Sequence, residues 1–244
     1  MVRPDDPQAP ARIQALDAAR GLALVLMMGF HLAYDLDFFK VMHLDMRQDP
    51  FWTGFRNFIV GSFILIAGIS LKLSMQRPLT FSRHLKRQKW LALSALTVSA
   101  ATWLVFPDSW IYFGVLHFIL TARILCFFLA RFQAVNIMAG FICIWIGISF
   151  EFSLFNAKWL NWIGFSPVKP VTEDYVPLFP WLGVFLLGMF PGGNIIQQKN
   201  LSLRHWLSIP GTRLLTLAGQ NSLLIYMFHQ PVLMGILYLM VHHV

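Results

Sequence analysis

Long apolar stretches separated by short polar breaks predict a polytopic bundle of α-helices. A helix needs about 20 predominantly apolar residues to cross a bilayer. By this measure we expect seven spans, at residues 13–35, 55–74, 89–106, 111–131, 134–153, 175–191 and 214–241. The polar and irregular residues 1–12 predict a flexible tail, so a single transmembrane domain would cover 13–244. Segment 153–166 leaves open an eighth, half-inserted span.

The composition supports an all-α membrane protein. Hydrophobic residues make up 57% of the chain and charged residues 12%, whereas a soluble domain is about 25% charged. The net charge of +8 does not indicate nucleic-acid binding, because Lys and Arg mark cytoplasmic loops in membrane proteins. Cys126 and Cys143 lie in apolar segments, so we expect both to be buried thiols. No metal-ligand spacing occurs, so we expect no metal.

The basic residues also predict the orientation. If the N-terminus is cytoplasmic, most of the 19 Lys and Arg residues lie inside. The exceptions on the outer side would be Lys40, Arg47, Arg56, Lys158 and Lys169. The reverse orientation would violate the positive-inside rule, so we expect the N-terminus inside.

Residues 17–35 carry ionisable groups at both ends of the first span. On a helix Arg20, His31 and Asp35 share one stripe, and Asp17 stands one turn before Arg20. The rise from Arg20 to His31 is about 16 Å, half of a bilayer core. His31 could act as a general base held by Asp35, or the pair could only lock the end of the span. We expect this stripe to form the main wall of an active site.

Other spans bring polar groups to the same outer level. Ionisable groups in hydrocarbon cost a few kcal/mol, so they usually face a cavity or a partner. The candidates are His117, Asp174, Tyr175, His229 and Gln230. Each also has a structural explanation, since His117 could be an interfacial histidine and His229 and Gln230 could satisfy backbone groups freed by Pro231.

Aromatic residues surround one of these candidates. The stretch 173–183 is either an interfacial anchor or a platform for a sugar ring, on which Trp181 would stack and Asp174 would bind hydroxyl groups. Trp159 and Trp162 on the preceding loop would extend such a platform.

Positive charge is concentrated at the inner side. Arg83, Lys86 and Arg87 either signal topology or dock a phosphorylated cytoplasmic ligand. Arg123 lies in the fourth expected span, where a guanidinium needs a carboxylate, a carbonyl or a phosphate nearby. Snorkelling to lipid phosphate is the alternative.

Several blocks resemble the catalytic-domain family of heparan-α-glucosaminide N-acetyltransferase, in its short bacterial form. The first is R-x-x-x-L-D-x-x-R-G-x-A-x-x-x-M-x-x-x-H-x-x-x-D, from Arg12 to Asp35. The others are FILIAGISLKLS (63–74), IYFGVLH (111–117), DYVPLFPWLG (174–183) and GQNSLLIYMFHQPVL (219–233). The opening block is also similar to the wider group of membrane acyltransferases that modify polysaccharides.

The resemblance implies transfer of acetyl from cytoplasmic acetyl-CoA to a sugar amine or hydroxyl across a bacterial cytoplasmic membrane. His31 would be the catalytic base and Asp35 its neighbour, with Asp17 and Arg20 near CoA. In lysosomal members a catalytic histidine lies further on, in the luminal loop, where this chain has His43. The stripe shared with Arg20 favours His31, and His43 remains the alternative.

The main rival is a solute transporter or a flippase for lipid-linked sugars, with the histidines relaying protons. Such proteins are usually built from repeats and broken helices, and we find no repeat. A membrane scaffold is a third option, against which the ionisable groups in four spans argue. The sequence leaves open the identity of the acceptor, the acyl chain length, direct transfer against an acetyl-histidine intermediate, and whether the chain forms a homo-oligomer.

Overall fold

The computed structural model describes residues 13–46, 48–75, 78–197 and 211–242, and this part of the chain is helical without strands. The expected tail 1–12 lies outside the described residues. The α-helices are α1 (Gln14–Phe38), α2 (Pro50–Ser74), α3 (Phe81–Arg87), α4 (Lys89–Val105), α5 (Val115–Leu125), α6 (Gln133–Ser149), α7 (Leu178–Gln197), α8 (Thr212–Gln220) and α9 (Ser222–His242). The described residues also form the short 3₁₀ turns η1 (Leu129–Arg131), η2 (Ser153–Asn156) and η3 (Asn161–Ile163).

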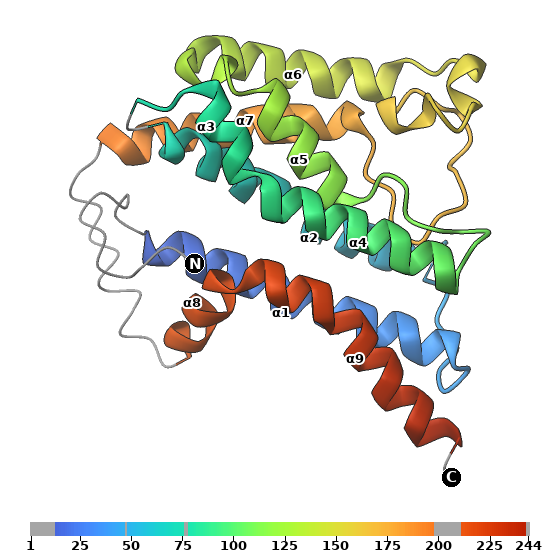
Figure 1. Ribbon diagram of the computed structural model, residues 1–244. Coiled ribbons are helices and arrows are strands. Elements are labelled where there is room, and N and C mark those ends of the chain that lie inside the picture. Colours follow the sequence, from blue (N-terminus) through green and yellow to red (C-terminus); the bar gives the residue numbers. More distant parts are fainter. Residues whose placement is uncertain (1–12, 47, 76–77, 198–210, 243–244) are drawn as a thin grey trace.

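The helices form two groups (Figure 1). Helices α1, α8 and α9 lie together, and they contact the remaining helices mainly through α2 and α4. In the larger group, α7 packs between α2 and α6. The start of α1 and helix α3 lie near one end of the molecule, and the loops that follow α1, α4 and α6 lie at the other end.

The seven expected spans are only partly recovered. Among the described residues, α1, α2 and the segment Ser222–Val241 of α9 are long and apolar enough to cross a membrane, and four shorter apolar helices accompany them. The expected span 111–131 is wrong, because α5 has 11 residues and a helix of that length rises only about 16 Å. The expected span 214–241 is recovered as Ser222–Val241 but was started too early, because α8 ends at Gln220 and Asn221 separates it from α9.

Glycines let α1 and α8 approach at backbone distance. A Cβ on Gly21 would collide with the carbonyl of Leu215, and one on Gly219 would collide with the carbonyl of Asp17. Small residues at helix contacts are typical of membrane bundles, where close backbone packing replaces the hydrophobic driving force. This contact fixes the N-terminal half of α1, which carries Arg20.

Candidate active site

Helices α1 and α9 bring four of the predicted residues together. The His31 and His229 rings lie with their centroids 4.9 Å apart in an edge-to-face arrangement. One turn along α1, Asp35 is fully buried and its Oδ1 accepts a hydrogen bond of 2.6 Å from Nε2 of Gln230. The structure does not form the expected hydrogen bond between Asp35 and His31: Oδ1 of Asp35 bonds Gln230, and Oδ2 has no partner among the described residues. We call these four residues the α1–α9 cluster.

The hydrogen bond of His229 defines its tautomer. Nδ1 of His229 lies 2.6 Å from the carbonyl oxygen of Tyr226. A carbonyl can only accept, so Nδ1 carries the hydrogen of the neutral ring and Nε2 keeps a lone pair. An orienting hydrogen bond on one ring nitrogen and a free lone pair on the other suit a general base.

Three buried acceptors of the cluster lack a partner among the described residues. They are Oδ2 of Asp35, Oε1 of Gln230 and Nε2 of His229. Each unsatisfied buried group costs about 1–3 kcal/mol. Oε1 of Gln230 cannot donate, and Oδ2 of an ionised Asp35 and Nε2 of the neutral His229 tautomer can only accept. The cluster therefore suits a ligand that brings several N–H or O–H donors.

Asp174 reaches the same helix α9 from the segment before α7. Its Oδ2 accepts a hydrogen bond of 2.8 Å from the backbone N–H of Val115, at the start of α5. Its carboxylate also interacts with the side chain of Tyr226. Tyr226 was not predicted from the sequence, where it is an isolated tyrosine in an apolar segment three residues before His229.

His117 is engaged in a separate network. Its Nδ1 accepts a hydrogen bond of 3.3 Å from the N–H of Gly114, so Nε2 carries the hydrogen. Nε2 lies 3.0 Å from Oγ of Ser99, whose hydroxyl donates to the carbonyl of Ile111. Both ring nitrogens thus hold the start of α5 against α4, and a catalytic role for His117 stays a prediction.

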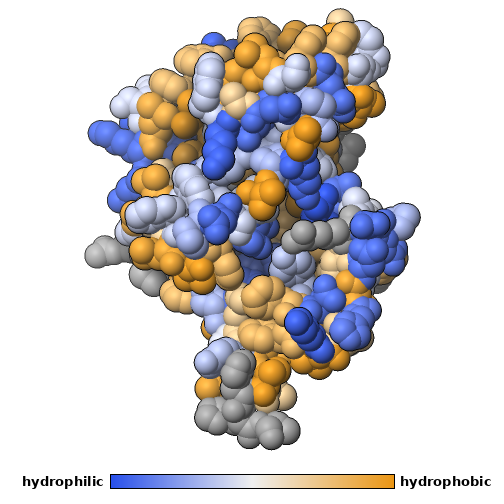
Figure 2. All heavy atoms as spheres, turned by 90° about the vertical axis from the view of Figure 1, so that its right-hand side faces the viewer, coloured by the Kyte–Doolittle hydropathy of each residue, from blue (hydrophilic) through white to orange (hydrophobic). Residues whose placement is uncertain are grey.

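The other residues predicted for the acceptor each have different surroundings. The hydroxyl of Tyr175 donates to the carbonyl of Asn161 at 2.7 Å. Trp181 packs against the hydrophobic core and lies close to Gly61 of α2. His43 is exposed in the loop between α1 and α2. Figure 2 shows hydrophilic residues gathered over much of the end that holds these loops.

Arg20 joins three helices at the opposite end. Its guanidinium forms an ion pair of 2.9 Å with Asp17, one turn earlier on α1. It also donates to Oγ of Ser70 on α2 at 2.9 Å and to the carbonyl of Gly219 on α8 at 3.4 Å. These contacts show that Arg20 at least connects α1 to its neighbours.

Arg123 is half-buried and has no carboxylate partner among the described residues. Its Nε donates to Oε1 of Gln88 at 2.9 Å. The carbonyl of Arg123 bonds Nε2 of the buried His84 at 3.0 Å. The charge of Arg20 lies near enough to repel that of Arg123. The terminal nitrogens of this guanidinium can therefore still donate hydrogen bonds, and a second positive charge lies nearby. Both features suit an anionic ligand.

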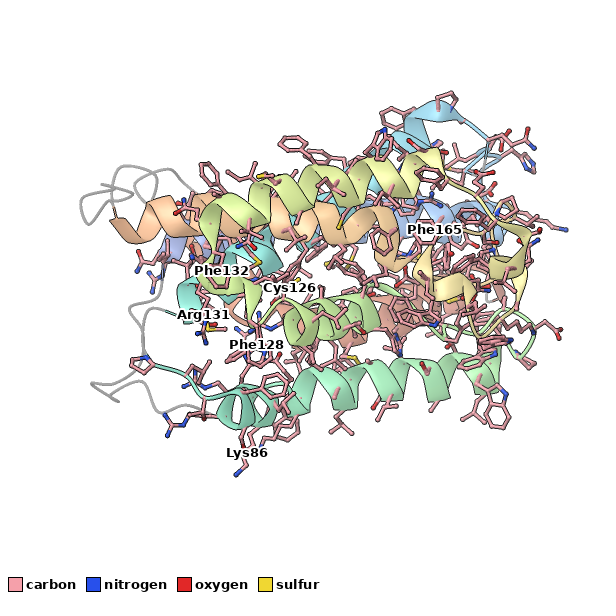
Figure 3. All side chains as sticks on the ribbon, turned by 90° about the horizontal axis from the view of Figure 1, so that it is seen from above. Lys86, Cys126, Phe128, Arg131, Phe132 and Phe165 are labelled. Atoms are coloured by element: carbon pink, nitrogen blue, oxygen red, sulfur yellow. The ribbon has the colours of Figure 1, made fainter. Side chains whose placement is uncertain are left out.

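Helix α3 places its charges outside. Arg83, Lys86 and Arg87 are exposed, whereas His84 and Gln88 point inward to Arg123. Lys86 extends away from the bundle, at the same end as Arg131 and opposite to Phe165 (Figure 3). The three exposed side chains therefore lie on the same short helix as His84, which bonds the carbonyl of Arg123.

Comparison with known proteins identifies the family. The family model described as heparan-alpha-glucosaminide N-acetyltransferase, catalytic, matches residues 12–231, which is most of the chain. This match confirms the resemblance drawn from the sequence blocks. Neither the curated proteins nor the solved structures give a significant match.

Proposed function

The chain belongs to the heparan-alpha-glucosaminide N-acetyltransferase catalytic family, and from this premise we propose that it transfers acetyl from acetyl-CoA to the amine of an amino sugar. The family supports a membrane acetyltransferase. The donor, the acceptor and the histidine chemistry are our inference from the site.

The three unpartnered acceptors of the α1–α9 cluster carry this proposal. A primary ammonium offers three N–H donors, whereas a hydroxyl group offers one. The ammonium charge would also neutralise the carboxylate of Asp35, which has no ion-pair partner among the described residues. An amine acceptor therefore satisfies the cluster better than a hydroxyl acceptor does.

The chemistry requires that this ammonium lose a proton before it can attack. Nε2 of His229 accepts that proton, and the resulting amine adds to the thioester carbonyl of acetyl-CoA. The tetrahedral intermediate collapses as the carbon–sulfur bond breaks, and the second nitrogen proton goes to the departing thiolate. The products are the N-acetyl sugar, CoA thiol and one proton, which His229 releases through the neighbouring His31.

The donor enters at the end of the molecule that carries the basic residues. Arg123 would bind a phosphate of CoA with its terminal nitrogens, and guanidinium–phosphate pairs are often bidentate. Arg83, Lys86 and Arg87 on α3 would attract the remaining phosphates. Arg20, which pairs with Asp17, lies near enough to Arg123 to repel it, so it would border the path of the donor towards the α1–α9 cluster.

The proposal is tested with purified protein, acetyl-CoA and glucosamine, with the product followed by mass spectrometry. We expect N-acetylglucosamine and free CoA in equal amounts. Replacing His229 by Gln removes the base but keeps a polar side chain, so kcat should fall by about 100-fold or more. His31→Gln should also lower kcat, and His43→Gln tests the alternative base in the loop.

Two results would contradict the proposal. One is acetyl transfer by His229→Gln at the wild-type rate, in a variant that unfolds at the wild-type temperature. The other is transfer to hydroxyl groups with no reaction at the amine. Burst kinetics would distinguish direct transfer from an acetyl-histidine intermediate, since only the intermediate releases CoA ahead of the product.

A further inference from the structure

Tyr226 connects the two groups of helices beside the α1–α9 cluster. It packs against the hydrophobic core of the larger group and also against the apolar seam formed by Leu24, Met27 and Ile59. Its side chain interacts with the carboxylate of Asp174, which precedes α7. A single side chain of α9 is therefore held by both groups.

The carboxylate of Asp174 is tightly surrounded by the start of α5. Its Oδ2 accepts a hydrogen bond of 2.8 Å from the N–H of Val115, and the N-terminus of α5 favours a negative charge there. A Cβ on Gly114 would collide with that same oxygen, so only glycine leaves room for the carboxylate. The N–H of Val176 also donates to the carbonyl of Phe113 at 3.3 Å, which ties the two segments together.

Tyr226 also contacts His229 directly. Its carbonyl oxygen accepts from Nδ1 of His229 at 2.6 Å, and the two rings lie 5.5 Å apart between centroids. The backbone of Tyr226 thus sets the tautomer of His229, while its hydroxyl end is bound across the interface by Asp174.

We infer that Tyr226 is a positioning residue, whose contact with Asp174 fixes the part of α9 that presents His229 to the acceptor. This inference rests on the proposed transfer reaction, because it assumes that His229 takes the proton. Tyr226 does not touch the reacting atoms in this assignment. Its contribution is to hold the base in register with α5 and with the segment before α7.

The test removes one oxygen atom. In Tyr226→Phe the ring still packs, but the bond to Asp174 is lost. We expect kcat to fall about tenfold or more, since misplacing a catalytic group by about 1 Å can cost 100-fold. The KM for acetyl-CoA should stay within about twofold, because the donor binds at Arg123. Tyr238→Phe, the same change at an exposed position of α9, should retain wild-type kinetics.

A second variant separates positioning from general destabilisation. Asp174→Asn weakens the same contact from the other side, so it should lower kcat about as much as Tyr226→Phe does. The double variant should then lose little more than either single variant, because both remove one interaction. Equal kcat in Tyr226→Phe and wild type, or additive losses in the double variant, would overturn the inference.

Hydrogen exchange makes the test independent of turnover. Tyr226→Phe should speed amide exchange in residues 113–117 and 172–177, and Tyr238→Phe should not. Unchanged exchange in both segments would overturn the inference even if the enzyme is active. Wild-type protein that does not acetylate amines would instead contradict the proposed function, and the exchange result would still decide whether the contact holds α9.

Discussion

At the scale of a single residue, a substitution of Arg123 tests donor binding separately from the chemical step. Replacing it by Gln removes the charge and the terminal nitrogens that would meet a phosphate. We expect the KM for acetyl-CoA to rise about tenfold or more, since hydrogen bonds to charged groups contribute about 1.5–3 kcal/mol. The kcat should change little. Initial rates at varied acetyl-CoA check this prediction.

Arg131→Gln is the matched control, since Arg131 is an exposed arginine at the same end of the molecule and is not part of the proposed donor site. Its KM should equal that of the wild type. A KM that rises equally in both variants would mean that only the overall positive charge matters, and it would refute a specific phosphate contact at Arg123.

The residues of the cluster were partly predictable from the sequence. The periodicity of α1 placed His31 and Asp35 on one stripe, and both face α9. The partners could not be read in the same way, because they depend on which helix packs beside α1. Asp35 bonds Gln230 instead of His31, and Tyr226 was missed because an isolated tyrosine in an apolar span carries no charge signal.

The contact between α1 and α8 gives a prediction at the level of elements. In Gly219→Ala the added methyl group meets the carbonyl of Asp17 on α1. Overpacking of this kind typically costs about 1–3 kcal/mol, so the midpoint of thermal unfolding should fall. Gly235→Ala is the control, because nothing lies within 4 Å of its Cβ position, and alanine in a helix is favoured over glycine by about 0.5–1 kcal/mol.

Thermal unfolding in detergent, followed by tryptophan fluorescence, measures both variants. The control should unfold at or above the wild-type temperature. If Gly219→Ala were as stable as Gly235→Ala, α1 and α8 would not be packed at backbone distance, and the placement of Arg20 would need revision.

Hydropathy predicted the positions of the helices better than their ends. An average over about 20 residues treats an apolar turn as part of a helix, so 111–131 read as one span although α5 begins only after Gly114. The same averaging joined α8 to α9 across Asn221, where the chain turns and the side chain amide donates to the carbonyl of Leu217. An average of hydropathy over a window therefore does not detect a turn that lies within an apolar stretch.

At the level of the whole molecule, the proposed donor and acceptor sites are separated along the helix axes. Positive charge without an ion-pair partner among the described residues lies at one end, at Arg123 and α3, and the acceptor-rich cluster of α1 and α9 lies farther along the bundle. The distance between Arg20 and His31 along the first span led to the same separation, which stays a prediction. The grouping of α1 with α8 and α9 needed the structure, because it depends on contacts between residues far apart in the chain.

The most direct test of the central claim is acetyl transfer across a membrane. Protein is reconstituted in one orientation into liposomes, with acetyl-CoA on the side of α3 and labelled glucosamine on the other side. We predict that N-acetylglucosamine forms on the glucosamine side while CoA thiol stays with the donor, and that His229→Gln forms neither. Unmodified glucosamine crossing the membrane, or acetylation only when both substrates share one side, would contradict the account.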